Sequence, residues 1–306
     1  KSSLLPSFPR MIPPLLRALS RPSRLTHALA PVFLAFGLTL AARAAESAPP
    51  TLWYLQPAAK WEEALPLGSG RLGAMVFGGT VDERIQFNED TLWTGKPHDY
   101  VRAGSGDALP EVRRLLAEGK VKEAEDLARA KVLSDPVRQK AYQPFGDLRL
   151  HFPGHDKISS YRRELDLDAA IARTSYQVGD VAHTREVFAS YPDQVIVVHL
   201  TASRPGQLTF TVRLDSPHKN STSHVETRSS RGDEAVARGA THTDLLPPQL
   251  TLTGQVQPDG LRFASRLRVA AAGGTVRADG ATLVVERADA VTLLLAAATS
   301  FRNYED

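Results

Sequence analysis

The sequence contains no cysteine, and this absence removes several kinds of chemistry at once. A thiol nucleophile, a cysteine-ligated zinc site and an iron–sulfur cluster all require cysteine, so we expect none of them. Disulfide bonds are excluded as well, so an exported protein of this sequence must be stabilised by its hydrophobic core. With 306 residues, of which 42% are hydrophobic, the chain is long enough to form such a core.

Acidic residues are missing from the first 44 positions, although the whole chain has 34 Asp and Glu. The same segment carries six of the 37 Lys and Arg residues, so without it the net charge changes from +3 to −3. The basic character therefore belongs to the N-terminal segment and not to a nucleic-acid-binding surface. We expect no nucleic-acid partner.

The N-terminal segment has the plan of a secretory signal peptide. Arginines at its start are followed by an uncharged apolar run at residues 28–42, and then by the small-residue pattern Ala42-Arg43-Ala44. Such a run is short for a bilayer span and typical of a signal sequence. We therefore predict that residues 1–44 are a signal peptide and that the protein is exported to the periplasm or the medium, free of the membrane after cleavage.

Two details of this segment bear on the prediction. Met11 is an alternative first residue, because residues 1–10 add nothing to the pattern. An uncleaved membrane anchor is the alternative interpretation, and Pro31 and Gly37, which interrupt the apolar run, speak against it.

From Thr51 onward, apolar residues recur with a period of two, as in half-buried antiparallel strands. Three segments show this most clearly: GDLRLHF (146–152), YRRELDLD (161–168) and QLTFTVRL (207–214). In the second, we expect Tyr161, Leu165 and Leu167 to share one face. Further strand candidates are RLGAMVFGG (71–79), ERIQFN (83–88), IARTSYQVG (171–179), AHTREVFAS (182–190), QVIVVHLTA (194–202), QLTLTGQV (249–256), LRFASRLRVAAA (261–272), ATLVVER (281–287) and AVTLLLAAAT (290–299). The pattern predicts a mainly β fold, a large antiparallel β-sandwich.

One segment of the mature chain, residues 107–133, has helical periodicity instead. Asp107 is a plausible N-cap, Gly119 a plausible residue just after a first helix, and a second helix is expected from Val121. We predict a short two-helix insertion that covers one end of a sheet.

The stretch from Asp215 to Gln249 is polar and irregular, which predicts a long loop. It contains His218, His224 and His242, but they lack the spacing of a histidine metal motif. We expect no metal site, and nothing in the sequence calls for a cofactor.

Two motifs of known function, one for dinucleotide binding and one for serine hydrolases, lack support in the sequence. GSGRLG (68–73) matches a dinucleotide-binding pattern in its letters, but that pattern needs a helix after it and a strand-like segment follows here. We expect a tight turn instead. The chain has no G-x-S-x-G motif, so a serine hydrolase mechanism has no sequence support.

The segment IQFNEDTLWTGKP (85–97) concentrates three polar residues, Asn88, Glu89 and Asp90, next to the aromatic Trp93. Glu89 and Asp90 are consecutive, so in a strand they point to opposite faces and do not form a catalytic pair. Two interpretations remain open. One is a turn in which Asn88 or Asp90 accepts backbone N–H groups while Trp93 plugs a sheet edge, and the other is direct contact with substrate.

With these residues in view, the chain resembles the glycoside hydrolase family 95 enzymes, the inverting α-L-fucosidases. The likeness is carried by residues 53–97, by YQPFGDLRLHF (142–152), by the run 161–202, by LDSPH (214–218) and by AAATSFRNYED (296–306). It extends over residues 51–306, with Ser69 in place of a usual asparagine and a polar insertion after His218.

The resemblance implies that residues 45–306 form the N-terminal β-super-sandwich of such an enzyme. It also implies that the catalytic carboxylates lie in an (α/α)6 barrel that follows the sandwich in the family and is absent from this chain. No catalytic residue is therefore expected here. A fucosylated glycan is the implied substrate of the full-length enzyme, and the barrel is the implied partner of the sandwich. For Asn88, Glu89, Asp90 and Trp93 we predict an interdomain or site-supporting role.

A non-catalytic carbohydrate- or partner-binding sandwich is the alternative function. Sugar-binding faces usually present two or three exposed aromatic side chains on one surface. The three tryptophans, Trp53, Trp61 and Trp93, all lie within the family-like stretch, and we expect them to have structural roles.

Overall fold

The computed structural model describes residues 49–95, 97–226 and 248–303. The chain divides into two units, residues 1–48 and 49–306, and every element described below belongs to the second. The predicted signal peptide (1–44) and His242 lie outside the described residues.

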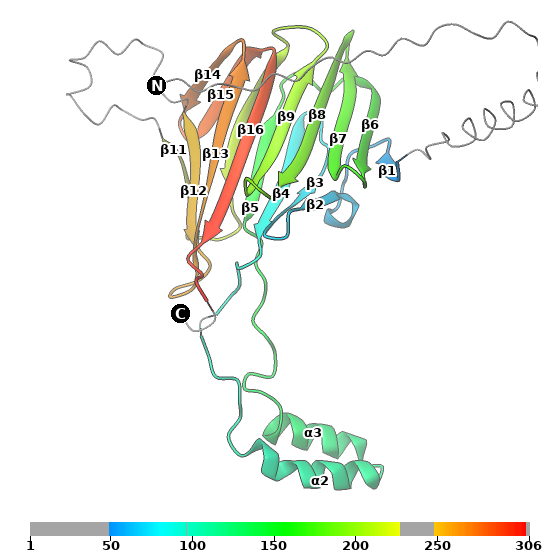
Figure 1. The fold of residues 1–306 in the computed structure, drawn as a ribbon, viewed down its shortest axis with the longest axis vertical. Coiled ribbons are helices and arrows are strands. Elements are labelled where there is room, and N and C mark those ends of the chain that lie inside the picture. The colour runs from blue at the N-terminus through cyan, green and yellow to red at the C-terminus, as the bar shows by residue number, and fades with distance from the viewer. Residues whose placement is uncertain (1–48, 96, 227–247, 304–306) are drawn as a thin grey trace, which may run out of the picture. The chain divides into compact units, whose positions relative to one another are not determined.

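Two antiparallel sheets form a β-sandwich (Figure 1). The nine-stranded sheet has the spatial order β1 (Thr51–Tyr54), β6 (Ile158–Asp166), β7 (Ile171–Val178), β8 (Val181–Ser190), β9 (Val195–Ala202), β16 (Ala290–Thr299), β13 (Arg262–Ala272), β12 (Gln249–Gln255) and β11 (Thr222–Glu226). The seven-stranded sheet has the order β14 (Thr275–Asp279), β15 (Thr282–Ala288), β10 (Leu208–Asp215), β5 (Gly146–His151), β4 (Asp82–Glu89), β3 (Leu72–Val76) and β2 (Leu65–Gly68). A 3-10 turn, η1 (Trp61–Glu63), precedes β2. The predicted mainly β fold is confirmed.

The period-two pattern correctly identified the inward-facing residues of the central strands. In β10, Leu208, Phe210, Val212 and Leu214 are all buried, and the residues between them are not. The second segment was predicted less well. Its strand β6 ends at Asp166, which leaves Leu167 half exposed, because the chain turns there towards β7.

The strands that the sequence did not reveal are β1, β2, β11 and β14. They are the outermost strands of the two sheets, two in each. An edge strand has a neighbour on one side only and buries little, so its side chains show no clear alternation. β11 also corrects the predicted loop from Asp215 to Gln249, because Thr222–Glu226 pairs with β12 in that stretch.

The core fills the space between the two sheets. Phe145 lies just before β5 and its ring centroid is 5.1 Å from that of Phe87 on β4 and 4.8 Å from that of Phe263 on β13. This aromatic contact joins the seven-stranded sheet to the nine-stranded one. Burial of each such side chain contributes about 1.5–3 kcal/mol to the hydrophobic stabilisation.

The helical insertion consists of α2 (Ser105–Ala117) and α3 (Val121–Lys131) (Figure 1). Gly119 has a φ of +76°, which suits glycine after a helix, and α3 begins at Val121 as predicted. The predicted N-cap was wrong: Gly104 caps α2, and Asp107 lies in the first helical turn. A carboxylate there still stabilises the free N–H groups of the helix start.

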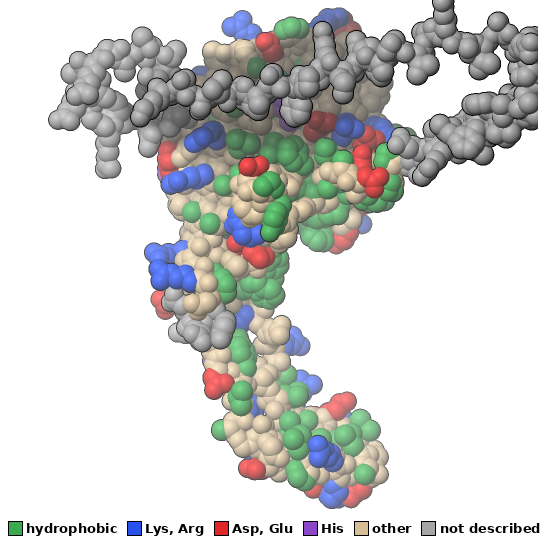
Figure 2. Space-filling view, viewed as in Figure 1, with side chains coloured by type: hydrophobic (Ala, Val, Ile, Leu, Met, Phe, Trp, Pro, Cys, Tyr) green, Lys and Arg blue, Asp and Glu red, His purple; other side chains and the backbone are tan. Residues whose placement is uncertain are grey.

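The two helices bury their apolar residues against each other. Val112, Leu115 and Ala124 form a small cluster with partly buried Leu127 and Val132, separate from the core of the sandwich. In the described part of the chain, these residues pack between the two helices and not against a sheet, so the predicted cover for a sheet end is not seen. The face of the pair seen in Figure 2 carries hydrophobic as well as charged side chains. Neither described helix has the length and apolar composition needed to cross a membrane.

Candidate functional site

The predicted Asn88–Trp93 segment leaves the end of β4, beside the turn between β2 and β3. Glu89 is the last residue of β4 and pairs with Leu72 of β3. Its side chain is buried, with 4% exposed, whereas the next residue, Asp90, is exposed. The two carboxylates therefore point to opposite faces, as expected from the alternation of a strand.

The carboxylate of Glu89 is held by partners from within the sandwich. Its Oε2 accepts hydrogen bonds from the backbone N of Thr91 at 2.9 Å and from the Thr91 hydroxyl at 2.6 Å. Its Oε1 lies 3.4 Å from Nη1 of Arg71. Both oxygens are engaged, so this carboxylate fixes the turn that follows β4.

Arg71 connects the two sheets at this end. It lies in the turn between β2 and β3 of the seven-stranded sheet. Its Nη1 donates to the carbonyl of Ala297 on β16 at 2.8 Å, and its Nε donates to Oε1 of Gln194, in the turn before β9, at 2.6 Å. One guanidinium thus ties the Glu89 turn to β16 and to the turn before β9 in the opposite sheet.

A second tie runs through Thr91, whose hydroxyl is hydrogen-bonded to the hydroxyl of Thr299 at the end of β16. Thr299 in turn accepts the backbone N–H of Phe301 at 3.2 Å. The segment after β4 is therefore linked directly to the last residue of β16 and, through it, to Phe301.

One of the two interpretations expected Trp93 to plug a sheet edge, and the structure shows that it does not. Its side chain is 41% exposed, and its Nε1 donates to the carbonyl of Asp90 at 2.9 Å. The ring packs against Tyr142, with centroids 5.1 Å apart, and the Tyr142 hydroxyl donates to the carbonyl of Glu89 at 3.2 Å. Burial, followed by the charges of Asp90 and Glu89, raises the pKa of Tyr142. The aromatic pair stiffens the loop and remains accessible on its outer side.

Asn88 behaves as the turn interpretation predicted, since its Oδ1 accepts the backbone N–H of Glu89 at 3.0 Å. The second such acceptor is Glu89 and not Asp90. Sequence reasoning missed Arg71, Tyr142 and Thr299, which hold the segment in place. Thr299 is 208 residues from Thr91, and no local pattern links them.

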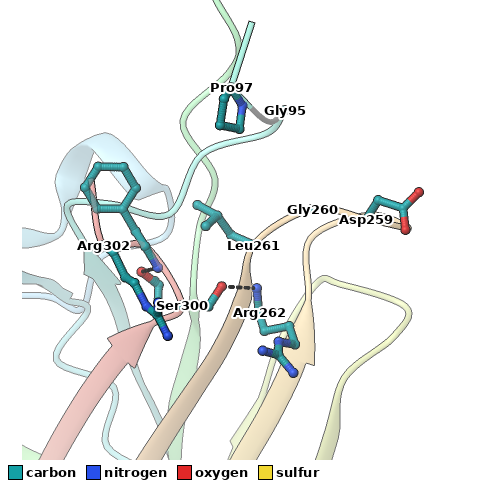
Figure 3. Close-up of a pocket in the computed structure, with 10 residues that line it drawn as sticks. Gly95, Pro97, Asp259, Gly260, Leu261, Arg262, Ser300 and Arg302 are labelled. Atoms are coloured by element: carbon teal, nitrogen blue, oxygen red, sulfur yellow. Dashed lines mark hydrogen bonds between the residues drawn. The ribbon is translucent and has the colours of Figure 1, made fainter. Parts of the chain in front are cut away.

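A pocket of about 500 Å³ opens beside this segment (Figure 3). It is formed by the loop containing Gly95 and Pro97, by residues 259–262 and by residues 299–302. Arg262 and Ser300 fasten two of these loops together, because the Arg262 N–H donates to the Ser300 hydroxyl at 3.1 Å and the Ser300 N–H donates to the Arg262 carbonyl at 2.8 Å. In the described residues its acidic lining residue is Asp259. An inverting glycosidase places two carboxyl groups on either side of the sugar, so this lining alone does not form such a pair.

The glycine-rich segment 68–73 is a strand–turn–strand connection, as predicted. Gly68 ends β2, Gly70 has a φ of +90° in the turn, and β3 begins at Leu72. Since a strand and not a helix follows, the segment lacks the helix N-terminus that a dinucleotide phosphate needs.

The three tryptophans, for which structural roles were predicted, are exposed at the surface and each contacts another side chain. Trp53 and Trp61 are 52% and 51% exposed, and Trp93 is also largely exposed. They contact three different places: Trp53 lies under Arg162 of β6, Trp61 donates its Nε1 to Gln86 of β4, and Trp93 packs on Tyr142. Their partners belong to different elements, which does not favour a single aromatic platform.

A charged pair lies inside the sandwich, at the other end of β4. Glu83 faces inward and is ion-paired with Arg185 of β8, and both side chains are almost completely buried. The other Glu83 oxygen accepts the N–H groups of Gly78 at 2.9 Å and of Arg84 at 3.0 Å. Burial raises the pKa of Glu83, while Arg185 and the N–H donors act to lower it. This pair crosses between the sheets.

Histidine and tyrosine side chains surround the pair. His155 Nδ1 lies 2.9 Å from the Tyr176 hydroxyl, and its ring is 4.6 Å from that of His183. Burial, followed by the charges of His183 and Arg185, lowers the pKa of His155 to about 4. Burial likewise lowers the pKa of His183 and raises that of Tyr176. Burial thus favours the uncharged forms of these side chains, and their ring contacts hold them beside the ion pair.

The two described histidines of the polar stretch, His218 and His224, have separate partners. His218 Nε2 lies 3.0 Å from the carbonyl of Pro144, and His224 lies 3.6 Å from Glu226. Within the described ranges, no group of three or more His, Asp or Glu side chains is arranged to hold a metal ion.

Comparison with known proteins identifies relatives that cover between 50% and 83% of this chain. The chain is 43% identical over 266 residues to Alpha-L-fucosidase 2 of Arabidopsis thaliana, covering 83% of this chain and 31% of the relative. It is 32% identical over 179 residues to Probable alpha-fucosidase A of Aspergillus niger, covering 55% of this chain and 22% of the relative. The corresponding protein of Aspergillus oryzae is 30% identical over 158 residues, covering 50% of this chain and 22% of the relative. The chain thus spans about a third or less of the length of these relatives.

These matches are consistent with the resemblance to family 95. Residues 52–304 match the family described as Glycosyl hydrolase family 65, N-terminal domain, and the region matched includes both sheets and the helical pair. The chain belongs to this family and is the N-terminal domain of a glycoside hydrolase.

Proposed function

We propose that this chain is the N-terminal β-sandwich of an exported α-L-fucosidase, an enzyme that hydrolyses terminal α-L-fucosyl linkages of glycans with inversion. The observation that carries the proposal is the 43% identity to Alpha-L-fucosidase 2 over 266 residues. The composition of residues 1–44, with its apolar run and small-residue cleavage pattern, supports export.

The proposal assigns no catalytic residue to these 306 positions. Hydrolysis with inversion needs two carboxyl groups, about 6.5–9.5 Å apart, on either side of the sugar. The carboxylate of Glu89 is occupied by Thr91 and Arg71, and that of Glu83 lies in the core with Arg185. The acid and base are expected in an (α/α)6 barrel, as the resemblance to family 95 implies, and the fucosylated glycan binds there.

Within this function, Asn88, Glu89, Asp90 and Trp93 form an interdomain or site-supporting loop. Arg71 and Thr299 anchor its base to both sheets, while Trp93 and Tyr142 leave an accessible aromatic surface. A rigid loop of this kind can support a neighbouring domain without touching the reacting atoms.

The first test is the release of free L-fucose from 2′-fucosylated lactose by the purified chain. We expect none above background, because a single sandwich without an opposed carboxylate pair lacks the acid and base. Release at an enzyme-like rate would overturn the assignment, and Glu89 and Asp90 would then be the first residues to replace. For a full-length relative, the anomer of fucose formed first, followed by proton NMR, tests inversion.

The second test concerns the loop. In a full-length relative, alanine at the positions that align with Asn88 and Trp93 is expected to lower kcat/KM or the melting temperature. Replacement of the residue that aligns with Trp53, an exposed tryptophan on another element, is the matched control. Unchanged kinetics and stability in the loop variants would rule out the supporting role.

A further inference from the structure

Three arginines form a row on the outer face of the seven-stranded sheet. Arg84, Arg149 and Arg213 lie on the adjacent strands β4, β5 and β10, and the strand register places Arg149 opposite both of the others. Their side chains are 34%, 35% and 58% exposed. Like charges directly opposite one another destabilise a sheet, so the row requires compensation.

Two aspartates supply part of that compensation and fix the geometry. Asp147 accepts from Arg84 Nε at 2.9 Å and from Arg149 Nη2 at 2.6 Å. Asp215 accepts from Arg149 Nε at 2.8 Å, and Arg213 approaches it to 3.7 Å. Within the row, two carboxylates pair with three guanidinium groups, and at the edge of the hollow Asp82 adds a third carboxylate, which contacts His151. Because Asp147 is buried beneath the arginines, their positions are set in advance.

The row borders a hollow of about 180 Å³ that opens to solvent. His151 and Thr211 line it together with the arginines. Of the acidic residues at the hollow, Glu83 turns its carboxylate into the core, and Asp82 lies 2.8 Å from His151 Nδ1. In the described part of the protein, the Nη groups of Arg84 have no hydrogen-bond partner, and the contact of Arg213 to Asp215 is long. These guanidinium N–H groups can bind a further acceptor, and their fork geometry suits a carboxylate or sulfate group.

An exposed indole lies beside the row. Trp61 donates its Nε1 to Gln86 of β4 at 2.5 Å, and Gln86 is opposite Asp147 in the strand register. An indole surface can pack against the apolar face of a pyranose while the arginines bind a charged substituent. Trp61 is not part of the lining of the hollow; it lies at Gln86, two positions along β4 from Arg84, so its apolar surface is near the arginines and not inside the hollow.

We propose that Arg84, Arg149 and Arg213 form a binding site for an oxyanion carried by a sugar, that is, a carboxylate or sulfate group. The site lies on the outer face of the seven-stranded sheet, among residues different from the Asn88–Trp93 loop. It does not depend on the fucosidase assignment.

The test is a titration of the isotope-labelled chain with sodium sulfate and, separately, with D-glucuronate, followed by amide chemical shifts in β4, β5 and β10. Sodium chloride keeps the ionic strength constant, and neutral D-glucose is the uncharged comparison. We expect saturable shifts with the oxyanions. Tighter binding of glucuronate than of sulfate supports an acidic sugar as the ligand, and equal binding supports the oxyanion site with the charged group as its main determinant.

Arg213→Gln is the informative variant, because its loss leaves the hydrogen bonds of Arg84 and Arg149 to the aspartates in place. It is expected to weaken binding about tenfold or more, the effect of one lost hydrogen bond to a charged group. Arg277→Gln is the matched control: Arg277 is 52% exposed on β14 of the same sheet and has its own pairs with Asp279 and Glu286. Shifts that do not saturate, or equal weakening by both variants, would reduce the row to a surface salt-bridge network and overturn the proposal.

Discussion

The two inward-facing carboxylates of β4 have different partners and different consequences. Glu89 ends the strand and is bound by Thr91 and Arg71 near the surface, so it determines the course of a loop. Glu83 lies in the interior, where Arg185 and two backbone N–H groups compensate its charge. Removing one partner of a buried pair leaves an uncompensated charge in a medium that solvates it poorly.

Replacement of Glu83 by leucine is therefore expected to lower the free energy of unfolding by about 3–5 kcal/mol, since Arg185 stays buried without its counter-ion. Urea denaturation measures this change. Glu186→Gln is the control. Glu186 follows Arg185 on β8 and pairs with Arg173 on the outer face of the sheet. Its loss is expected to cost about 1 kcal/mol or less. Similar costs for the two variants would contradict the role assigned to the buried pair.

At the scale of elements, the helical pair and the sandwich have separate cores. α2 and α3 pack through Val112, Leu115 and Ala124, and this cluster shares no buried residue with the core between the sheets. A pair of short helices with so small a core is close to the limit of stability. The pair is thus able to open while the sheets stay intact.

Leu115→Ala is expected to speed amide hydrogen exchange throughout residues 105–131 and to leave the protection of the strands unchanged. The lost packing is worth about 2–5 kcal/mol, which exceeds what so small a unit can spare. Leu116→Ala is the matched control, because the neighbouring side chain is 52% exposed. If exchange also rises in β5 and β10, the two cores are coupled and the prediction fails.

At the scale of the whole molecule, the interior of the sandwich contains neutral histidines, which makes stability depend on pH. The pKa of His155 is about 4 in the folded chain, below the value of about 6.5 for an ordinary histidine. Between these values the unfolded chain binds a proton that the folded chain does not. The contribution of His155 to stability is therefore fully present above pH 6.5 and is lost as the pH falls towards 4.

We expect His155 to account for a loss of about 1–2 kcal/mol in the free energy of unfolding between pH 7 and pH 5. His183, whose pKa is lowered in the same direction, adds to the loss. Urea denaturation of the parent chain and of His155→Gln at both pH values isolates the effect, because the remaining titrating groups are common to both. A variant that loses as much stability as the parent would show that His155 is not responsible.

Sequence alone gave much of the fold, because the central strands are buried on one face and therefore alternate in polarity. β10 and β5 were predicted for this reason, as were the helix pair and the turn at Gly70. The opposite directions of Glu89 and Asp90 followed from the same period of two. Resemblance, rather than composition, supplied the glycoside hydrolase family.

Only the tertiary structure decided which strands form the sheet edges and what holds the loop after β4. The outermost strands β1, β2, β11 and β14 acquire their structure by pairing with a neighbour, and such pairing leaves little trace in a segment's own pattern. Thr91 and Thr299 meet across 208 residues, and Arg84, Arg149 and Arg213 form a row only once three strands align. A local pattern records burial on one element, whereas these contacts depend on the register and packing of several elements at once.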